Sequence, residues 1–432
     1  MSGHSITVAV ALHLALGLAA CAVEGGGPPR AEPAAVGPSA FIEATGLFGL
    51  VPHDAPPAHA QVRDFLEHPH FAGLSVRTGW DDIEPVENVY DWSYLDSMIA
   101  EAQKHGKKIM LRVRPSWETP DWVYDAGAEP FWYYERNDGG KLHRMPVPWD
   151  PVFQAKWADF IAELGRRYAG HPDLVHVLVT GASRSDCEMY LPSNGERASS
   201  QATWEAIGYT PSRLIDAWEH WIDSWAAALP RTLVSLSLSS ALYDDGVLDE
   251  VADYCTSRYP WRVALKISYW SAGNDPTFAP TRAFLSRIDE RTHGGVEAVS
   301  LLSDMPDAAR DAISWHAVLW AEPYPSNRHQ MQALYDEQQR RKRIVLTTRF
   351  RASRRRGQVA LSWTGDGLET VRVLRRPDAP PVGADDPLAT IVYEGRGSSA
   401  LDTGLSDATP LYYALFELPS KYTVAFATAL PK

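Results

Sequence analysis

Cysteine and positive charge are both scarce in this chain of 432 residues. Its three cysteines are too few for a disulfide-rich scaffold. Lysine and arginine number 41 against 54 aspartates and glutamates, and the net charge of −13 argues against a nucleic-acid partner, because phosphate binding needs a basic surface. No His-Glu-x-x-His motif or Cys/His cluster is present, so we expect neither a cofactor nor a metal.

Aromatic residues, in contrast, are abundant. The chain has 16 tryptophans and 18 tyrosines, more than a core usually needs, and 45% of its residues are hydrophobic. A chain of this length and apolar content can bury a large core. Composition therefore indicates a large, acidic globular protein with aromatic surface to spare.

The first residues predict export. Residues 6–20 form an apolar run that is too short to anchor stably across a bilayer. The run ends in Leu18-Ala19-Ala20-Cys21, which resembles a bacterial lipoprotein signal with Cys21 as the lipidated residue. The alternative is an ordinary secretory signal cut nearby. We expect a cell-envelope lipoprotein that meets the membrane only through its lipid, or otherwise a secreted protein, with residues 22–40 as a flexible Gly/Pro-rich tether.

Strand and helix patterns alternate from residue 41 to about 343. Asp150-Pro151 and Thr210-Pro211 each supply an N-cap and a first-turn proline before an apolar helical stripe. This order predicts a (β/α)8 barrel rather than an open doubly wound sheet. The expected strands are 46–51, 73–78, 108–114, 174–181, 233–239, 263–269, 296–303 and 316–322.

Two long connections, 115–149 and 182–209, follow strands. In a barrel such segments lie on the C-terminal face, where active sites are built. The first is rich in aromatic residues without helical or strand periodicity. These residues would either pack a small core of their own or form a cleft that stacks on sugar faces. Trp117 and Trp122, nearest a strand end, are the stronger candidates for stacking.

Alternation along the strands turns many polar side chains towards the barrel axis. Buried cations need carboxylates or an anionic ligand, and clustering at the later strand ends favours a ligand site over a polar core. A further hypothesis takes Arg112, Arg114 and Lys266 as a subsite for an acidic sugar. The residues expected to point inward are Arg77, Met110, Arg112, Arg114, His176, Thr180, Lys266, Ser268, Trp270, His316, Trp320 and Glu322.

Motifs concentrate around the second and third expected strands. They are Trp80-Asp81-Asp82-Ile83-Glu84-Pro85, Tyr90-Asp91-Trp92, Gly106-Lys107-Lys108 and Thr119-Pro120-Asp121-Trp122. Together they resemble the clan A glycoside hydrolases, which include β-galactosidase-like and cellulase-like enzymes, and at fold level the resemblance covers roughly residues 46–325. With the inward residues, it implies a carbohydrate site made of Arg77, Trp80, Arg112, Arg114, Trp117, Trp122, His176, Trp270 and Trp320.

The resemblance also implies two catalytic carboxylates. These enzymes use an acid/base after the fourth strand and a nucleophile after the seventh, about 5–5.5 Å apart in retaining enzymes. Here the fourth strand ends without the Asn-Glu pair, and the seventh, as predicted, ends at Ser303-Asp304 with Glu297 near its start.

We therefore expect Glu188 to be the acid/base, with a pKa raised by an aromatic pocket. Glu322 is the first candidate for the nucleophile and Asp304 the second. For Glu188 the alternative is a solvated loop carboxylate, and for Glu322 a structural partner of Arg77 or Lys266. Glu84 is expected to be structural.

From residue 344 the sequence predicts a separate all-β module. Basic runs at 340–343 and 354–356 mark its boundary, as solvated linkers or as domain-interface charges. Trp363, followed later by Tyr412 and Tyr413, resembles the core tryptophan and corner tyrosine of a fibronectin type III module, to which we assign no chemistry. The expected strands are 358–363, 370–375, 390–393, 411–417 and 423–427.

Two functions remain open from the sequence. One is an exported glycoside hydrolase, probed by Glu188→Gln, which would abolish hydrolysis and keep sugar binding. The other is a catalytically inactive barrel that captures carbohydrate at the cell surface. The missing Asn-Glu pair favours the second function, and an aromatic cleft suits both. We expect a monomer that binds carbohydrate and no nucleic acid.

Overall fold

A computed structural model gives the structure of the chain. Cys21, Asp304, His316 and the N-terminal tether lie outside the described residues, and for Trp270 only the backbone is described. The structure describes residues 41–135, 138–184, 187–192, 201–242, 245–270, 279–285, 287–288, 291–298, 318–323, 332–377, 380–381, 384–418 and 422–431.

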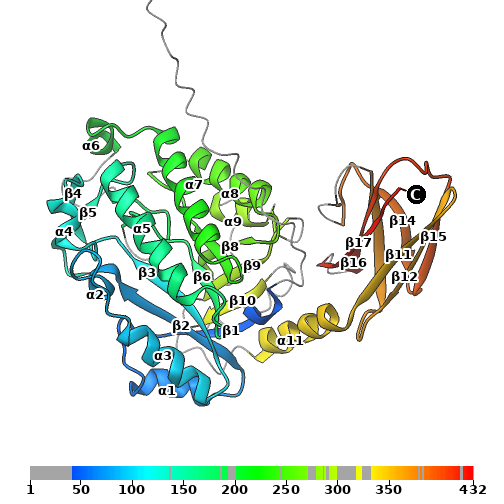
Figure 1. The fold of residues 1–432 in the computed structure, drawn as a ribbon, viewed down its shortest axis with the longest axis horizontal. Coiled ribbons are helices and arrows are strands. Elements are labelled where there is room, and N and C mark those ends of the chain that lie inside the picture. Colours follow the sequence, from blue (N-terminus) through cyan, green and yellow to red (C-terminus); the bar gives the residue numbers. More distant parts are fainter. Residues whose placement is uncertain are drawn as a thin grey trace, which may run out of the picture. The chain divides into compact units, whose positions relative to one another are not determined.

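Parallel strands close into a barrel in the order β1-β10-β9-β8-β7-β6-β3-β2 (Figure 1). All eight strands expected from the sequence are confirmed, with shifted ends. Their bounds are β1 (Gly46–Leu50), β2 (Phe71–Gly79), β3 (Lys108–Arg114), β6 (Leu174–Leu178), β7 (Leu233–Leu238), β8 (Val263–Trp270), β9 (Gly294–Ala298) and β10 (Val318–Pro323).

Helices surround the barrel strands (Figure 1). Asp150 caps α5 by accepting from the Phe153 amide at 2.8 Å, and Thr210 caps α7 by accepting from the Arg213 amide at 3.2 Å. No described helix is both long and apolar enough to cross a bilayer. The helices are α1 (Ala60–Glu67), α2 (Trp80–Ile83), α3 (Ser93–Lys104), α4 (Asp121–Asp125), α5 (Pro151–Tyr168), α6 (Gln201–Ala206), α7 (Pro211–Ala228), α8 (Asp245–Arg258), α9 (Ala279–Leu285) and α11 (Gln332–Thr347), with a short 3₁₀ turn, η1 (Ile42–Ala44), before β1.

Most of the tryptophan surplus is used in the core. Indole rings pack between α5, α7 and the barrel, where apolar groups surround them and water is excluded. The expectation of spare aromatic surface is therefore only partly right. The fully buried tryptophans are Trp80, Trp157, Trp204, Trp218, Trp221, Trp225 and Trp320.

The connection after β3 is structured, contrary to the expectation of an aperiodic loop. It forms α4 and an antiparallel hairpin of β4 (Pro130–Glu135) and β5 (Lys141–Pro146). Phe131 and Tyr133 are buried and Trp132 is half-exposed, so β4 alternates as a strand with one covered face. Phe131 stacks on Trp204 with ring centroids 3.7 Å apart, so part of the aromatic content builds a core rather than a cleft.

An apolar layer fills the barrel interior. Phe48, Met110, Leu178, Ala264 and Trp320 are fully buried and belong to one cluster, which also contains residues of η1 just before β1. Phe41 and Ala44 precede β1, so the cluster extends past the amino ends of the strands, and Cys187 in the loop after β6 belongs to it as well.

The C-terminal module has two antiparallel sheets, ordered β11-β12-β15 and β14-β13-β16-β17. The five expected strands are confirmed, and β11 and β15 were missed. A shared core of residues from both sheets makes this a β-sandwich. The strands are β11 (Arg349–Arg355), β12 (Gln358–Thr364), β13 (Thr370–Arg376), β14 (Thr390–Gly395), β15 (Ser399–Thr403), β16 (Leu411–Leu418) and β17 (Tyr422–Ala429).

Both basic runs lie in regular elements rather than in solvated linkers, and Arg340 pairs with Glu417 of β16, as the alternative of an interface charge expects. The first lies inside α11, which continues to Thr347, and the second begins in β11. Arg354 is buried and donates to the carbonyls of Thr409 at 2.7 Å and Ala429 at 3.0 Å. In the same module Trp363 is buried, and the hydroxyl of Tyr413 donates to Asp402 at 2.9 Å.

Candidate active site

Four charged side chains meet inside the barrel. They are Arg112 of β3, Lys266 of β8, Glu297 of β9 and Glu322 of β10, all buried. Glu297 Oε2 lies 3.1 Å from Arg112 Nη2 and 2.5 Å from Lys266 Nζ. Glu322 pairs with Arg112 through Oε2 and with Lys266 through Oε1 at 3.1 Å. The two cations and two carboxylates balance, which buried charges require.

The loop after β6 brings Glu188 to this network. The preceding residue, Cys187, is buried, and its Sγ lies 3.6 Å from both Arg112 Nη1 and Lys266 Nζ. The backbone of Glu188 forms an isolated parallel β-bridge with Ser237 of β7. Ser237 is in turn the register partner of Lys266 in β8. Glu188 is 5% exposed, so the structure contradicts the alternative of a solvated loop carboxylate.

Glu322 lies deeper than Glu297. Glu322 is 0% exposed, and Glu297 is 5% exposed. Ser75 of β2 also donates to Glu322 Oε2 at 2.9 Å. This burial and pairing agree with the structural alternative that the sequence left open for Glu322, and they favour Glu297 as the carboxylate nearer to a substrate. Glu322 is the structural partner of Lys266 that the sequence left as the alternative, with Arg112 in place of Arg77.

Glu297 is the residue that the sequence reasoning misplaced. The prediction started the seventh strand at residue 296, which put Glu297 near its beginning, whereas β9 is described from Gly294 to Ala298. Gly294-Gly295 looks like a turn, but a Cβ at Gly295 would lie 2.0 Å from the Trp320 ring. Glycine is therefore needed inside the strand, and Glu297 lies in the later half of the described strand.

Two predicted sugar-binding residues belong to the core of the barrel. His176 bonds Ser235 Oγ through Nε2 at 2.8 Å, and its ring meets that of Trp320 edge-on at 4.5 Å. Burial, together with Lys266 and Arg112, holds the pKa of His176 well below its usual value, so the imidazole is neutral. His176 and Trp320 are both 0% exposed and cannot contact a sugar as predicted.

Trp80 is likewise a core residue rather than a sugar contact. It is 0% exposed, and its Nε1 donates to Glu84 Oε2 at 2.8 Å. Glu84 also accepts from the Asn88 amide at 2.8 Å, which makes it structural as expected. Trp122 packs edge-on against Trp80 at 5.5 Å and donates to the Glu84 carbonyl at 2.9 Å, but remains half-buried.

Trp117 and Arg114 lie at the end of β3. Arg114 donates through Nε to Glu118 Oε2 at 2.8 Å, and its guanidinium lies 5.7 Å from the centre of the Trp117 ring. The Trp117 ring packs against His143 in a tilted arrangement with centroids 4.7 Å apart, and it is half-buried. A ring at this position is compatible with sugar stacking.

The predicted subsite for an acidic sugar is not supported. Arg112 and Lys266 are paired with Glu297 and Glu322, and Arg114 is paired with Glu118. Arg77 is half-buried and donates through Nε to the Val51 carbonyl at 3.1 Å, at the end of β1.

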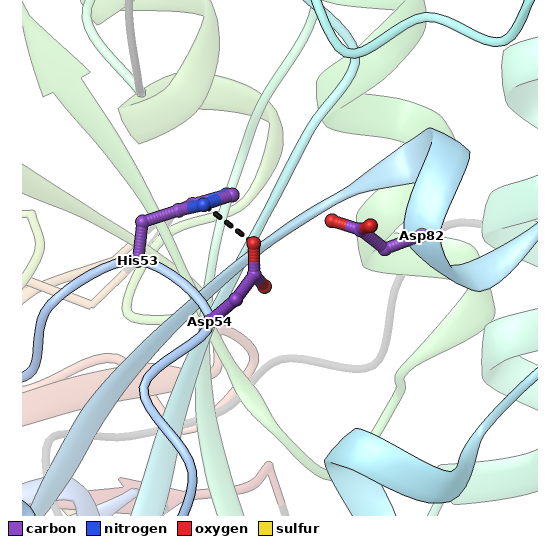
Figure 2. A group of neighbouring side chains, drawn as sticks. All are labelled: His53, Asp54 and Asp82. Atoms are coloured by element: carbon purple, nitrogen blue, oxygen red, sulfur yellow. Dashed lines mark ion pairs between the residues drawn. The ribbon is translucent and has the colours of Figure 1, made fainter. Parts of the chain in front are cut away.

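A second polar group lies where β1 and β2 end (Figure 2). His53 Nδ1 is 2.5 Å from Asp54 Oδ2, and the Asp82 carboxylate of α2 points towards the same pair. Burial lowers the pKa of His53, but hydrogen bonds to Asp54 and Glu118 outweigh it and raise this pKa to about 9. His53, Asp54 and Asp82 each offer one ligand atom, and these atoms lie within 4.8 Å of one another. In this structure the group forms an ion-paired cluster at the barrel mouth.

Comparisons with known proteins agree with a carbohydrate-active barrel for part of the chain. Residues 67–198 match the sequence profile of a family described as beta-galactosidase. Beta-galactosidase BbgII of Bifidobacterium bifidum is 31% identical over 100 residues, which are 22% of this chain and 14% of that protein. The chain thus matches only a small part of this relative's length. These matches show a domain similar to clan A glycoside hydrolases.

Solved structures of glycoside hydrolases also align with the chain. A trimodular endoglucanase of subfamily GH5_4 aligns over 91% of this chain and 79% of its own, with 9% identity and a TM-score of 0.43. The GH10 structure from Paenibacillus barcinonensis aligns over 66% of this chain and 84% of its own, with 13% identity and a TM-score of 0.39. Both scores are low, so the barrel is defined by its own strand order.

Proposed function

We propose that the barrel is a retaining glycoside hydrolase in which Glu188 is the general acid/base and Glu297 the nucleophile. One observation carries this proposal. Arg112 and Lys266 contact both Glu297 and the sulfur of Cys187, the residue before Glu188. The backbone next to Glu188 therefore lies beside the network that holds Glu297. Glu297 comes from barrel strand seven and Glu188 from the loop after strand four, the positions that such chemistry uses.

Each residue then has a defined step. Glu188 protonates the glycosidic oxygen while Glu297 attacks the anomeric carbon, so that the bond to Glu297 forms as the glycosidic bond breaks. Glu188, now a carboxylate, takes a proton from water, whose oxygen attacks the anomeric carbon and releases Glu297. Contact with Arg112 and Lys266 holds the Glu297 carboxylate in place for its attack.

The substrate proposed is a β-linked oligo- or polysaccharide, with β-galactosides tested first because of the sequence matches. Half-buried Trp117 and Trp122 would stack on sugar rings, and the ion-paired cluster around His53 would bond sugar hydroxyls. Export with lipidation at Cys21, a fibronectin type III identity for the C-terminal module, and a monomeric state remain part of this proposal.

The test is hydrolysis of a panel of β-galactosides, xylan and β-glucans, with binding measured in parallel. Glu188→Gln and Glu297→Gln should each lower kcat by about 10²–10⁴-fold or more and retain binding, because each removes one reacting group and keeps the side-chain size. The matched control is Glu67→Gln, at an exposed position at the end of α1. Full activity in either active-site variant would refute the assignment.

The second function, an inactive sugar-capturing barrel, is favoured by the missing Asn-Glu pair after strand four. It predicts binding to the same panel without any turnover in the unmodified protein. Bond cleavage by the unmodified protein, lost in Glu297→Gln, would exclude it.

A further inference from the structure

We propose that Glu322 is a positioning residue for Glu297, acting through the two cations that they share. This inference rests on the proposed hydrolytic function, in which Glu297 is the nucleophile.

Glu322 can affect Glu297 through the two cations that they share, so the two carboxylates need not touch. Each cation bonds both carboxylates: Lys266 Nζ lies 2.5 Å from Glu297 Oε2 and 3.1 Å from Glu322 Oε1. Arg112 Nη2 lies 3.1 Å from Glu297 Oε2 and also pairs with Glu322 Oε2. Whatever charge Glu322 carries therefore changes how strongly the cations attract Glu297.

Depth separates the two roles. Glu322 is 0% exposed and accepts from Ser75 Oγ at 2.9 Å, so its carboxylate is fixed on the closed side of the network. Glu297 is 5% exposed. Glu322 can therefore act on the substrate only through Arg112 and Lys266.

The groups that face the network leave its charge balance intact. His176 of β6 is neutral, because burial and the two cations disfavour its protonation. Arg77 of β2 donates through Nε to the Val51 carbonyl, and Cys187 contacts both cations through its sulfur. Glu188 follows Cys187 in the loop after β6, and Glu118 is held by Arg114 at the end of β3. Of these groups, Glu322 is the one that shares Arg112 and Lys266 with Glu297.

This arrangement makes an unusual prediction about pH dependence. The acid limb of kcat/KM reports the group that must be ionised in the free enzyme, here Glu297. Glu322→Gln leaves both cations to Glu297 and should move that limb to lower pH by about one unit. Lys266→Met leaves Glu297 and Glu322 with Arg112 alone. This variant should move the acid limb to higher pH by a similar amount. A purely structural role would lower activity without opposite shifts.

The experiment measures kcat/KM against pH for the unmodified protein, Glu322→Gln, Lys266→Met and the charge-conserving Lys266→Arg, with melting curves for each. We expect opposite displacements for the first two variants and an acid limb near the original position for Lys266→Arg. If Lys266→Met does not fold, the shift in Glu322→Gln alone decides the matter.

Two outcomes would overturn the inference. One is an acid limb that stays in place in folded Glu322→Gln. The other is loss of activity in Glu322→Ala with recovery by added azide and formation of the α-glycosyl azide from a β-glycoside, because that result would make Glu322 itself the nucleophile. Failure of the proposed function looks different: Glu297→Gln would then remain active, or the unmodified protein would cleave none of the sugars.

Discussion

The buried charge network predicts a stability loss that depends on pH. Arg112→Met removes a cation from a fully buried site and leaves Glu297 and Glu322 with Lys266 alone. Breaking a buried ion pair by removing one partner costs about 3–5 kcal/mol. A second route gives a similar figure: one carboxyl group must take up a proton, and from the ordinary glutamate pKa of about 4.3 to pH 7 this costs about 4 kcal/mol.

The sign of the pH dependence follows from proton binding. The folded variant holds one proton more than the unfolded chain, so its stability is greatest at low pH and falls by about 1.4 kcal/mol per pH unit as pH rises. Urea unfolding between pH 5 and 8, followed by tryptophan fluorescence, measures this, because 15 of the 16 tryptophans precede residue 344.

A double variant gives the decisive control. Arg112→Met combined with Glu322→Gln leaves one cation, Lys266, with one carboxylate, Glu297. Because these charges balance, the double variant should recover most of the lost stability. The reasoning is refuted if the single variant loses less than about 1 kcal/mol, or if the double variant is as unstable as the single one.

Two further predictions concern other parts of the barrel. The raised pKa of His53, about 9 against an ordinary 6.5, contributes stability that is fully present below about pH 6.5 and is lost as pH rises through 9. Melting temperature should therefore fall between pH 7 and 9 and do so less in His53→Gln; equal slopes would contradict the ion pair with Asp54. Gly181→Ala would place a Cβ 2.0 Å from the Trp221 ring, so we expect a loss of about 1–3 kcal/mol in urea unfolding, and an unchanged midpoint would show that the ring can move.

Much of the barrel could be predicted because its local signals agree with its tertiary structure. Strands buried on both faces appear as short apolar runs bounded by turn residues, and the capped starts of α5 and α7 are explicit in Asp150-Pro151 and Thr210-Pro211. The start of β9 was misjudged, because Gly294-Gly295 has the composition of a turn. Its place in a strand depends on the Trp320 ring from a different strand.

The sequence predicted which residues face the candidate site, but not which cation pairs with which carboxylate. Alternation correctly turned Arg112, Lys266 and Glu322 inward. Which carboxylate is deeper depends on the stagger between neighbouring strands, and one sequence does not encode that stagger locally. The same limit applies to Arg354. Its basic run has the composition of a solvated segment, but carbonyl groups of β17 and of the loop before β16 accept its hydrogen bonds.

The apolar cluster that fills the barrel interior determines how a sugar could reach the proposed site. Phe48, Met110 and Trp320 are fully buried in it, so no sugar chain can thread through the barrel as through a pore. Under the proposed function, a sugar held by Glu188 and Glu297 would enter and leave from the carboxyl end of the barrel. A long polymer would thus have to lie across the rim, and a cleaved fragment would have to leave before the next could bind.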